Sequence, residues 1–468
     1  MSGTRQLGGA TRRDVLRYAF LSAGAATLPA WLAACGASTA EVAADPGPGA
    51  GGDPEGKEFS IAPGPLSAVG PLVETGVDGI LAPAGFSVRA VARNLYNPVN
   101  GLFDPLGLSG YHWHASPDGG AVFAAEDGGW VYVSNSEEDA GGVGALRFAA
   151  DGTLTSAYRI LDQTRRNCAG GATPWQTWLS CEETADGLVY ECQPFGTAAE
   201  ARARPALGLF NHEAASVDLD TRTVYLTEDS GEGRLYRFLA EASDLLPEGR
   251  LKLESGRLQV LNIAGYENGG YPEGQALHTL HRVRWVDVEA PTRPQAEVRA
   301  ELAAAGKPVP GSVFRGGEGI WRYELPATLR SLPPGGSRPS RALIFFACKG
   351  DNRVLAYDID NELIEIVFDN DSIELPMDDV DNLVVSPAGD VIVAEDGEAM
   401  RLIVVVPNQP AKTLLQISLG GSELTGPAFT PDGSRLYFSS QRGPNLPLLK
   451  TGSGVTYELT IPPEFRRA

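Results

Sequence analysis

Short apolar strands separated by sharp turns recur along this chain from about residue 80 to its end. The turns read Ser-Pro-Asp-Gly, Ala-Asp-Gly, Asp-Thr, Ser-Pro-Ala-Gly and Thr-Pro-Asp-Gly, at 116–119, 150–152, 220–221, 386–389 and 430–433. Units of strands that repeat roughly every 50 residues are typical of β-propellers. We therefore predict an all-β fold, a β-propeller of about six blades. Helix is expected only in short insertions, at 198–204 and at 294–305, where Ala, Glu and Arg favour it.

Composition limits the partners of the chain. It carries 59 acidic against 38 basic residues, a formal net charge of −21 at pH 7. Such a charge repels nucleic acid and anionic lipid headgroups, so we expect neither as a partner. An anionic substrate would bind only where cations reverse the local field. We expect a monomer that acts on small molecules.

The N-terminus has the pattern of an export signal. Arg12 and Arg13 precede an apolar run at 18–34, which resembles a twin-arginine signal and is too short and too rich in Ala, Gly and Pro for a membrane span. The run ends Leu-Ala-Ala-Cys, as in a bacterial lipobox, which predicts a lipid on Cys35. Ordinary cleavage nearby, which leaves a soluble product, is the alternative. Both readings place the protein in the periplasm or on the cell surface.

These features predict three segments. Residues 1–34 form the signal peptide, 35–58 form a disordered tether of Gly, Pro, Ala and acidic residues, and 59–468 form a single propeller domain.

Carboxylate and amide side chains recur where the predicted strands begin and end. The first strand of each propeller blade lines the central channel, so these side chains are expected around its mouth. They are Asn135, Glu137, Glu182, Glu183, Glu213, Glu228, Asp229, Glu318, Asp381, Asn382, Glu395 and Asp396. Converging carboxylates are stable only if they are protonated or neutralised by cations. The pattern favours a site for hard cations such as calcium, although solvated strand ends would give the same pattern.

The segment 167–183 adds a thiol to these carboxylates. It begins with Asn-Cys-Ala-Gly-Gly, for which we expect a tight turn, and continues through Thr-Pro-Trp into a short strand at 177–179. It ends on Glu182 and Glu183, so Cys168 and a carboxylate are expected at one end of a strand pair. A thiolate among carboxylates suits a transition metal. The alternative is a buried structural cysteine.

Other polar residues receive structural interpretations. His212 is expected to support Glu213 from behind, and His112 and His114 to pack beside Trp113. A disulfide between Cys181 and Cys192 across a hairpin is compatible with an oxidising compartment. The sequence has no nucleophile elbow, P-loop or dinucleotide fingerprint.

The run Arg-Asn-Cys-Ala-Gly-Gly-x-Thr-Pro-Trp-x-Thr-Trp-Leu-Ser-Cys-Glu-Glu closely resembles the signature of the PhoX family of alkaline phosphatases. The resemblance continues, in the order of the family, at 84–87, 130–135, 212–213, 317–320 and 423–433. It departs at 135–137, where Asn-Ser-Glu stands in place of the Asn-His-Glu that is frequent in the family. The resemblance implies an exported β-propeller that hydrolyses small phosphate monoesters with Fe3+ and Ca2+.

The resemblance also implies roles for single residues. The implied catalytic residues, which are also ligands of the catalytic metal cluster, are Cys168, Glu182, Glu213 and Glu318, with Cys168 bound to iron as a thiolate. The implied ligands on the calcium side are Asp381, Asn382, Glu137, Glu228 and Asp229.

Two other functions remain compatible with the sequence. One is a calcium-dependent propeller lactonase or phosphotriesterase, and the other is a non-catalytic calcium-binding propeller lipoprotein. Lactonase and phosphotriesterase sites of this kind need calcium and no cysteine, and in the binding protein Cys168 would be a packed thiol. The role of this residue therefore distinguishes the phosphatase from the other two functions.

Overall fold

The computed structural model describes residues 59, 61–270, 277–370, 376–406, 409–419, 421–444 and 454–466. Residues Pro54–Ala468 form one compact unit. The predicted signal peptide, Cys35 and the tether lie outside the described residues. None of the described helices combines the length and the apolar character needed to cross a membrane.

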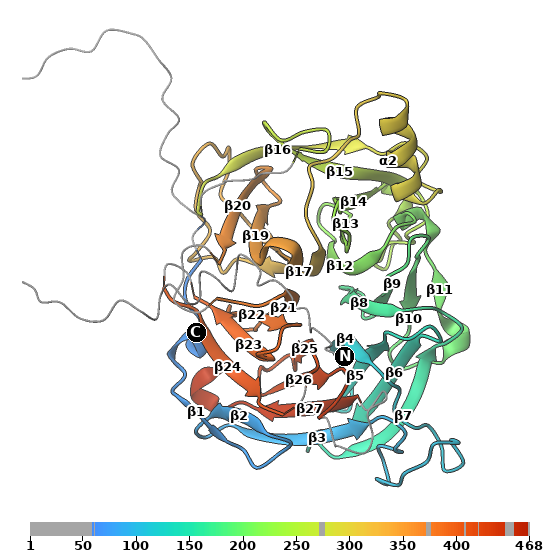
Figure 1. Cartoon of the computed structure of the whole chain (residues 1–468), viewed down its shortest axis with the longest axis vertical. Coiled ribbons are helices and arrows are strands. Elements are labelled where there is room, and N and C mark those ends of the chain that lie inside the picture. The colour runs from blue at the N-terminus through green and yellow to red at the C-terminus, as the bar shows by residue number, and fades with distance from the viewer. Residues whose placement is uncertain are drawn as a thin grey trace, which may run out of the picture. The chain divides into compact units, whose positions relative to one another are not determined.

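The described strands form six antiparallel blades around a central axis, as Figure 1 shows. The first three blades are β4 (Pro117–Ala124), β5 (Trp130–Ser136), β6 (Gly142–Phe148) and β7 (Leu154–Leu161); β8 (Asn167–Ala172), β9 (Trp178–Glu182), β10 (Val189–Cys192) and β11 (Arg202–Ala203); and β12 (His212–Asp218), β13 (Thr223–Glu228), β14 (Leu235–Ala240) and β15 (Gly256–Ile263). The other three are β17 (Gly317–Glu324), β18 (Ala342–Cys348), β19 (Arg353–Asp358) and β20 (Leu363–Phe368); β21 (Val380–Val385), β22 (Val391–Glu395), β23 (Arg401–Val405) and β24 (Lys412–Ile417); and β25 (Leu424–Phe429), β26 (Arg435–Ser440), β27 (Val455–Thr460) and β3 (Ser87–Arg93).

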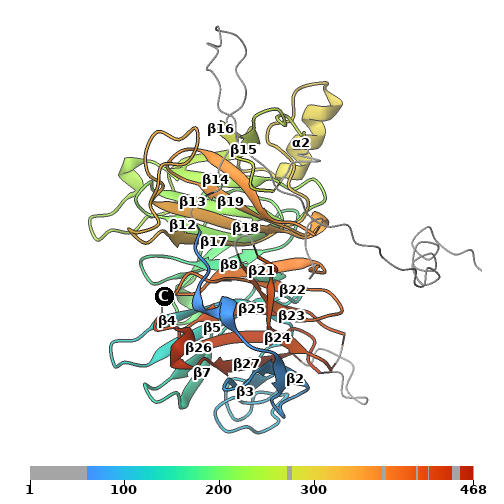
Figure 2. The ribbon, with the colours of Figure 1, turned by 90° about the vertical axis from the view of Figure 1, so that its left-hand side faces the viewer.

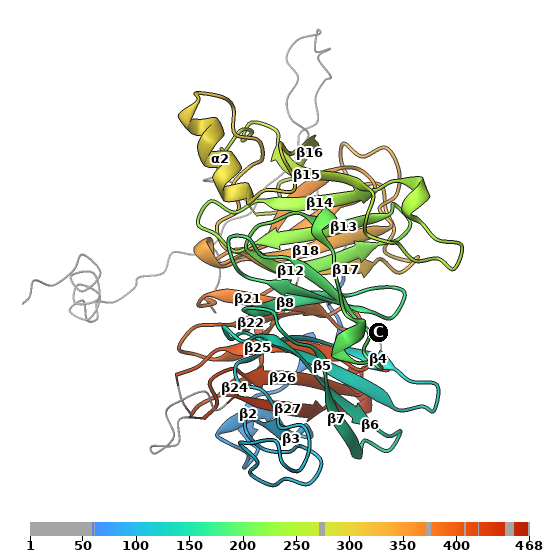
Figure 3. The ribbon, with the colours of Figure 1, turned by 90° about the vertical axis from the view of Figure 1, so that its right-hand side faces the viewer.

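The last blade closes the ring with a strand from the other end of the chain. Strand β3 pairs antiparallel with β27, from Ser87 opposite Thr460 to Arg93 opposite Val455. Two further strands, β1 (Leu72–Glu74) and β2 (Ile80–Pro83), extend the fifth blade beyond β24, and β16 (His281–Asp287) joins the outer strands β15 and β20. Views from the two sides show the sheets of successive blades lying one above another (Figures 2 and 3).

Helix is confined to insertions. The single described α-helix is α2 (Gln295–Ala304), as the composition of 294–305 predicts. The expected helix at 198–204 is wrong beyond its first turn, because η2 (Ala198–Glu200) gives way to β11, which pairs with β10. The remaining 3-10 turns are η1 (Pro65–Ala68), η3 (Pro205–Leu207), η4 (Ala242–Asp244), η5 (Lys349–Asp351) and η6 (Pro463–Phe465).

The hydrophobic core lies between neighbouring blades. Phe345 of the fourth blade packs in one buried cluster with Val393 and Ile403 of the fifth. Trp130 of the first blade donates a hydrogen bond to the hydroxyl of Tyr437 in the sixth, at 2.8 Å. Each such buried apolar side chain contributes about 1.5–3 kcal/mol to stability. The blades therefore hold one another in register around the axis.

All six innermost strands carry a β-bulge near their start, where two residues face one pairing position of the second strand. The bulges follow Pro117, Asn167, His212, Gly317, Val380 and Thr425. A bulge bends its strand and redirects a side chain that would otherwise alternate in the sheet. Here the first bulge residue of five blades is one that can bind a metal.

The innermost strands approach one another so closely that glycine is required at several contacts. A Cβ atom at Gly171 would overlap the carbonyl oxygen of Ala215, and one at Gly319 would overlap the backbone of Leu383. This packing explains two incorrect predictions. Segments 116–119 and 167–171 have the composition of turns, yet they form the bulged starts of β4 and β8. Their glycines serve close approach between strands rather than chain reversal.

Candidate metal centre

Five blades each place one potential ligand at the first position of the bulge, and we call these residues the first ring. They are Asp118, Cys168, Glu213, Glu318 and Asp381. In the sixth blade the position is Gly426, whose φ of +59° favours glycine, so this blade contributes no side chain to the first ring. All five members are buried.

A second ring surrounds the first, and it consists of the residue that follows the second strand of each blade. In five blades the last residue of the second strand pairs with the residue just before the bulge, as Ser136 pairs with Pro117 and Glu182 with Asn167, so the next residue lies beside the bulge. In the sixth blade the last residue, Ser440, pairs with Leu424, one residue earlier. The second ring is Glu137, Glu183, Asp229, Lys349, Asp396 and Gln441.

Members of the two rings, together with Glu423 just before β25, form four groups of three residues, and within each group the ligand atoms all lie within 4.8 Å of one another. Each group shares a residue with another, so they form one continuous cluster. The groups are Asp118, Glu137 and Cys168; Cys168, Glu183 and Glu213; Glu213, Glu318 and Asp381; and Asp381, Asp396 and Glu423.

The electrostatics of this cluster are unfavourable without a cation. Burial, together with the neighbouring carboxylates, raises the pKa of Glu183 to about 8. The same two causes raise the pKa values of Asp118, Cys168, Glu213 and Glu318 well above their ordinary values. Cations bound among these groups would reverse the effect and favour the ionised forms.

Two ring carboxylates have oxygens with no hydrogen-bond donor among the described residues. Oε1 of Glu213 and Oε1 of Glu318 are both fully buried and accept no hydrogen bond. A buried, unsatisfied carboxylate oxygen is costly, and in native proteins it needs a specific partner such as an ion. The donor set fits metal ions: a thiol suits a transition metal, and carboxylate oxygens suit calcium.

Lys349 is the cationic member of the second ring. Its Nζ lies 2.7 Å from Oδ2 of Asp396, 3.2 Å from Oδ2 of Asp381 and 3.9 Å from Oε1 of Glu318. Although burial opposes the charge, these three carboxylates raise the pKa of Lys349, so the ammonium group stays protonated. This lysine neutralises part of the cluster with the charge of the chain itself.

The structure separates the paired acids at the ends of the second strands. Adjacent residues of a strand face opposite ways, so one member of each pair reaches the cluster and the other turns into its blade. Glu182 accepts backbone hydrogen bonds from Arg165 and Leu188, and Glu228 pairs with Arg299 of α2 at 2.7 Å.

The implied roles of Glu182 and Glu228 are thus not matched by their positions. The residues that follow them, Glu183 and Asp229, take those places in the second ring. The implied residues that the structure brings together are Cys168, Glu213, Glu318, Asp381, Glu137 and Asp229.

Asn382 is close to the cluster, and both ends of its amide make hydrogen bonds within the protein. Its Nδ2 donates to Oδ1 of Asp381 at 2.8 Å, and its Oδ1 accepts from the backbone N–H of Gly426 at 2.6 Å. The side chain therefore orients Asp381. Glu137 remains within the cluster, where its two oxygens accept hydrogen bonds from Arg166 and Gln441.

The histidines and the other cysteines have structural positions. The ring of His212 packs against Phe210 and hydrogen-bonds the carbonyl of Gly208, and burial lowers its pKa to about 4, so it is neutral. His114 hydrogen-bonds the hydroxyl of Tyr111. Cys181 and Cys192 are free thiols, since Cys181 lies opposite Val189 rather than Cys192, and the disulfide considered above is absent.

Sequence reasoning missed several members of the cluster. Asp118 was assigned to a turn, and Lys349 was missed because only acidic and amide residues at strand ends were considered. Glu183 and Asp396 were noted only as strand-end acids, and Glu423 only within a motif. The signal that could have found most of them is positional: each residue follows either the first or the last paired residue of a strand near the axis.

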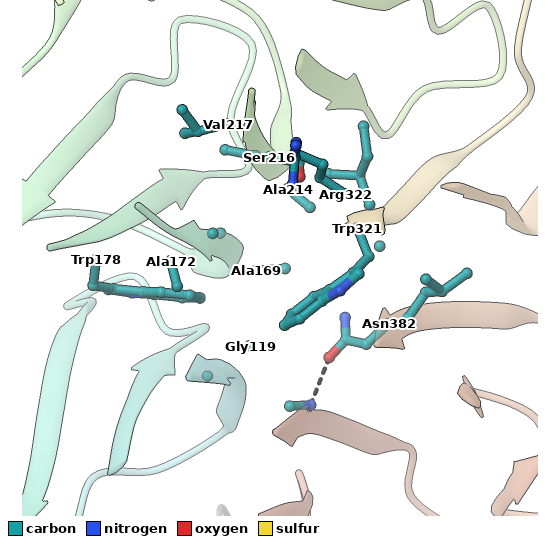
Figure 4. Close-up of a pocket in the computed structure, with 18 of the residues that line it drawn as sticks. Gly119, Ala169, Ala172, Trp178, Ala214, Ser216, Val217, Trp321, Arg322 and Asn382 are labelled. Carbon is teal, nitrogen blue, oxygen red and sulfur yellow. Dashed lines mark hydrogen bonds between the residues drawn. The ribbon is translucent and has the colours of Figure 1, made fainter. Parts of the chain in front are cut away.

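A cavity of about 230 Å³ lies in the channel on the far side of the first ring. It is lined by the second bulge residues, which are mostly small, and by the later parts of the innermost strands. Figure 4 shows the indole of Trp321 projecting into this space, with Trp178 at its side and Asn382 at its edge. Trp178 also lies in a buried cluster with Phe123 and Val131 of the first blade, so it both lines the channel and packs between blades.

The chain is similar to known proteins both in sequence and in structure. Residues 138–326, somewhat less than half of the chain, match the family model of alkaline phosphatase PhoX. No curated protein matches the sequence. The solved structure of Pseudomonas fluorescens PhoX, in complex with vanadate as a transition-state analogue, is similar with a TM-score of 0.64 and 16% identity, and the match covers 87% of this chain and 100% of that one.

Two weaker structural likenesses are a gluconolactonase from Xanthomonas campestris and the PQQ domain of a pyranose dehydrogenase from Coprinopsis cinerea. The first has a TM-score of 0.42 and 12% identity, with 84% of this chain and 98% of that chain covered. The second has a TM-score of 0.40 and 14% identity, with 82% and 97% covered. The predicted resemblance to the PhoX family and the predicted propeller fold are both confirmed.

Proposed function

From the match of residues 138–326 to the family of alkaline phosphatase PhoX, we propose that this protein is a metal-dependent phosphatase that hydrolyses small phosphate monoesters. The match supports a phosphatase, and the substrate class, the metals and the export of the protein are our proposals.

The observation that carries the proposal is the pair of concentric rings. Carboxylates and one thiol form four overlapping groups of three residues, within each of which the ligand atoms lie within 4.8 Å of one another, and two of the buried carboxylate oxygens have no donor in the described residues. Such a cluster is stable only with cations, and cations allow a strongly acidic protein to bind a phosphate dianion.

We assign the metals by the chemistry of the donors. Cys168 would hold iron together with carboxylates of the two groups that contain it, Glu183 and Glu213 in one and Asp118 and Glu137 in the other, since a thiol among carboxylates suits a transition metal. The carboxylate groups around Asp381 would hold calcium. Metals bound there supply positive charge for the phosphate oxygens and lower the pKa of water at the site.

The residues of the chain prepare this site in three ways. Gln441 donates from Nε2 to Asp118 at 2.8 Å and to Glu137 at 2.7 Å, which fixes one carboxylate of each ring. Asn382 orients Asp381 in the same manner. Lys349, at the rim of the cluster and partly exposed, has an ammonium group that can donate hydrogen bonds to a phosphate oxygen.

The decisive experiment is elemental analysis of the exported protein, combined with hydrolysis of p-nitrophenyl phosphate at alkaline pH. We expect iron and calcium, with turnover. Cys168→Ala should remove iron and activity while the protein stays folded. Cys181→Ala, which changes a buried cysteine outside the cluster, should keep both and is the matched control. Full activity and normal iron in Cys168→Ala would refute the assignment.

The same samples distinguish the other functions. Calcium without iron, with hydrolysis of lactones or phosphotriesters, would indicate the lactonase or phosphotriesterase. Calcium without hydrolysis of any of these substrates would indicate a binding protein.

We also propose export by the twin-arginine route and a lipid on Cys35, on the sequence pattern alone. Replacement of Arg12 and Arg13 by Lys should retain the protein in the cytoplasm, and Cys35→Ser should release the exported protein from membranes, as fractionation of the native host would measure.

A further inference from the structure

The long connection between β3 and β4 exposes an unusual amount of apolar surface. Eleven large apolar side chains are exposed among the described residues, and six of them lie between Tyr96 and Leu108. Scattered apolar side chains are normal on protein surfaces, whereas a contiguous group marks an interaction site. The six are Tyr96, Val99, Leu102, Phe103, Leu106 and Leu108, with 37%, 49%, 60%, 60%, 77% and 84% exposure. We call residues 94–111 the apolar loop.

The apolar loop is held in shape by its own polar groups. Asn97 accepts a hydrogen bond from Val99 and donates one to the carbonyl of Ser109, while its backbone bonds Leu102 and Gly101. The backbone N–H of Asp104 donates to the carbonyl of Leu95 at 2.8 Å. Many of the backbone groups that would oppose entry into an apolar phase are thus already paired.

Charge is almost absent from the loop. Asp104 is the only charged residue between Asn94 and Tyr111, in a chain whose net charge is −21. Its side chain is buried, and its carboxylate accepts hydrogen bonds from the N–H of Leu108, the N–H of Ser109 and the hydroxyl of Ser109. The carboxylate therefore faces into the loop, and the surface is left to leucine, phenylalanine and valine.

The loop projects past β7 at the rim of the ring, at the lower right of Figure 1. The guanidinium of Arg159 on β7 stacks on Tyr111, which fixes the base of the loop against the first blade. The first ring, the second ring and the channel lie at the axis, so the loop does not contribute to the cluster described above.

We infer that the apolar loop inserts into the surface of a lipid bilayer. Leucine and phenylalanine on a protruding, internally bonded loop suit the boundary between headgroups and acyl chains. A second copy of the chain is a poor occupant, because two bodies of such negative charge repel each other. A lipid on Cys35, 24 residues before Phe59, would leave a tether that reaches at most about 80 Å and keep the loop near a membrane.

The test uses the full chain with Cys35→Ser, so that no covalent lipid contributes, and vesicles of zwitterionic phosphatidylcholine. We expect the protein to float with the vesicles. The double variant Leu106→Ser with Leu108→Ser should bind about a hundredfold more weakly, since each inserted leucine contributes roughly a tenfold factor. Leu332→Ser, at another site of 60% exposure, should bind as the parent does and is the matched control.

A spectroscopic reporter keeps the result independent of folding and of catalysis. Phe103→Trp should show a blue shift of its emission on addition of vesicles, and equal melting temperatures would show that all variants are folded. Absence of vesicle binding by the parent, or equal binding by the double variant, would overturn the inference. A parent that sediments as a dimer while the double variant is a monomer would overturn it in favour of a contact between copies.

Discussion

Glu213 lies where two groups of the cluster meet, so its charge should destabilise the metal-free protein and stabilise the metal-bound one. Its neighbours Glu183, Glu318 and Asp381 have oxygens within 4.8 Å of its own. At that distance two ionised carboxylates repel by about 3 kcal/mol at an effective dielectric constant of about 20. Protonation relieves part of this repulsion, because the pKa values of the group are raised.

We therefore expect Glu213→Gln to raise the free energy of unfolding of the metal-free protein by about 1–3 kcal/mol at pH 8. The substitution costs little in hydrogen bonding, since Oε1 of Glu213 has no donor among the described residues. In calcium the charge of Glu213 becomes favourable, so the variant should gain less stability from the ion than the parent does. Thermal and denaturant unfolding in chelator and in calcium measures both effects.

Glu182→Gln is the matched control, because Glu182 is a buried carboxylate of the same size outside the cluster. Its two oxygens accept backbone N–H groups, and an amide can replace only one of them. It should lose about 1–3 kcal/mol in chelator and in calcium alike. A Glu213→Gln protein that is less stable than the parent in chelator, or that gains as much from calcium, would refute the convergence of these carboxylates.

Three further predictions test the surroundings of the cluster. The metal-free protein should become more stable as the pH falls from about 8 to about 6, because Glu183 and Asp381 have folded-state pKa values raised to about 8 and about 6, and the folded state binds more protons there; a flat or opposite pH profile of the unfolding midpoint in chelator would contradict this. Lys349→Met should bind calcium more tightly by calorimetry and lower the stability of the metal-free protein, and unchanged calcium binding would show that the ammonium does not compete for the site. Glu228→Ala should destabilise the fold by about 3 kcal/mol, because it leaves Arg299 buried without its partner, yet leave the metal content unchanged by elemental analysis.

The propeller could be predicted from the sequence because the residues of its turns favour chain reversal by their own conformational preferences. Turns at 150–152, 220–221, 386–389 and 430–433 join the strands that the structure shows, since Asp-Gly and similar pairs reverse a chain by themselves. The starts of β4 and β8 could not be predicted in this way. One glycine at each start is required because a strand of the next blade, distant in the sequence, packs too closely to leave room for a Cβ atom.

The candidate site shows the same division between local and distant information. Cys168, Glu213 and Glu318 were found because motifs contain them. The choice between Glu182 and Glu183 depends on which way a strand faces, and a bulge changes that by one residue. Lys349 could not be found from an acidic pattern, because its role depends on the carboxylates that surround it in space.

The bulges also separate the residues that determine the chemistry at the axis from the residues that pair the strands. The first bulge residue lies outside the regular pairing of its strand, so its side chain can vary while the partners of the ladder stay the same. Asp118 and Cys168 illustrate this, as one position holds a carboxylate and its equivalent holds a thiol. A substitution at a bulge position can therefore alter the chemistry at the axis one blade at a time, while the residues that pair the strands stay unchanged.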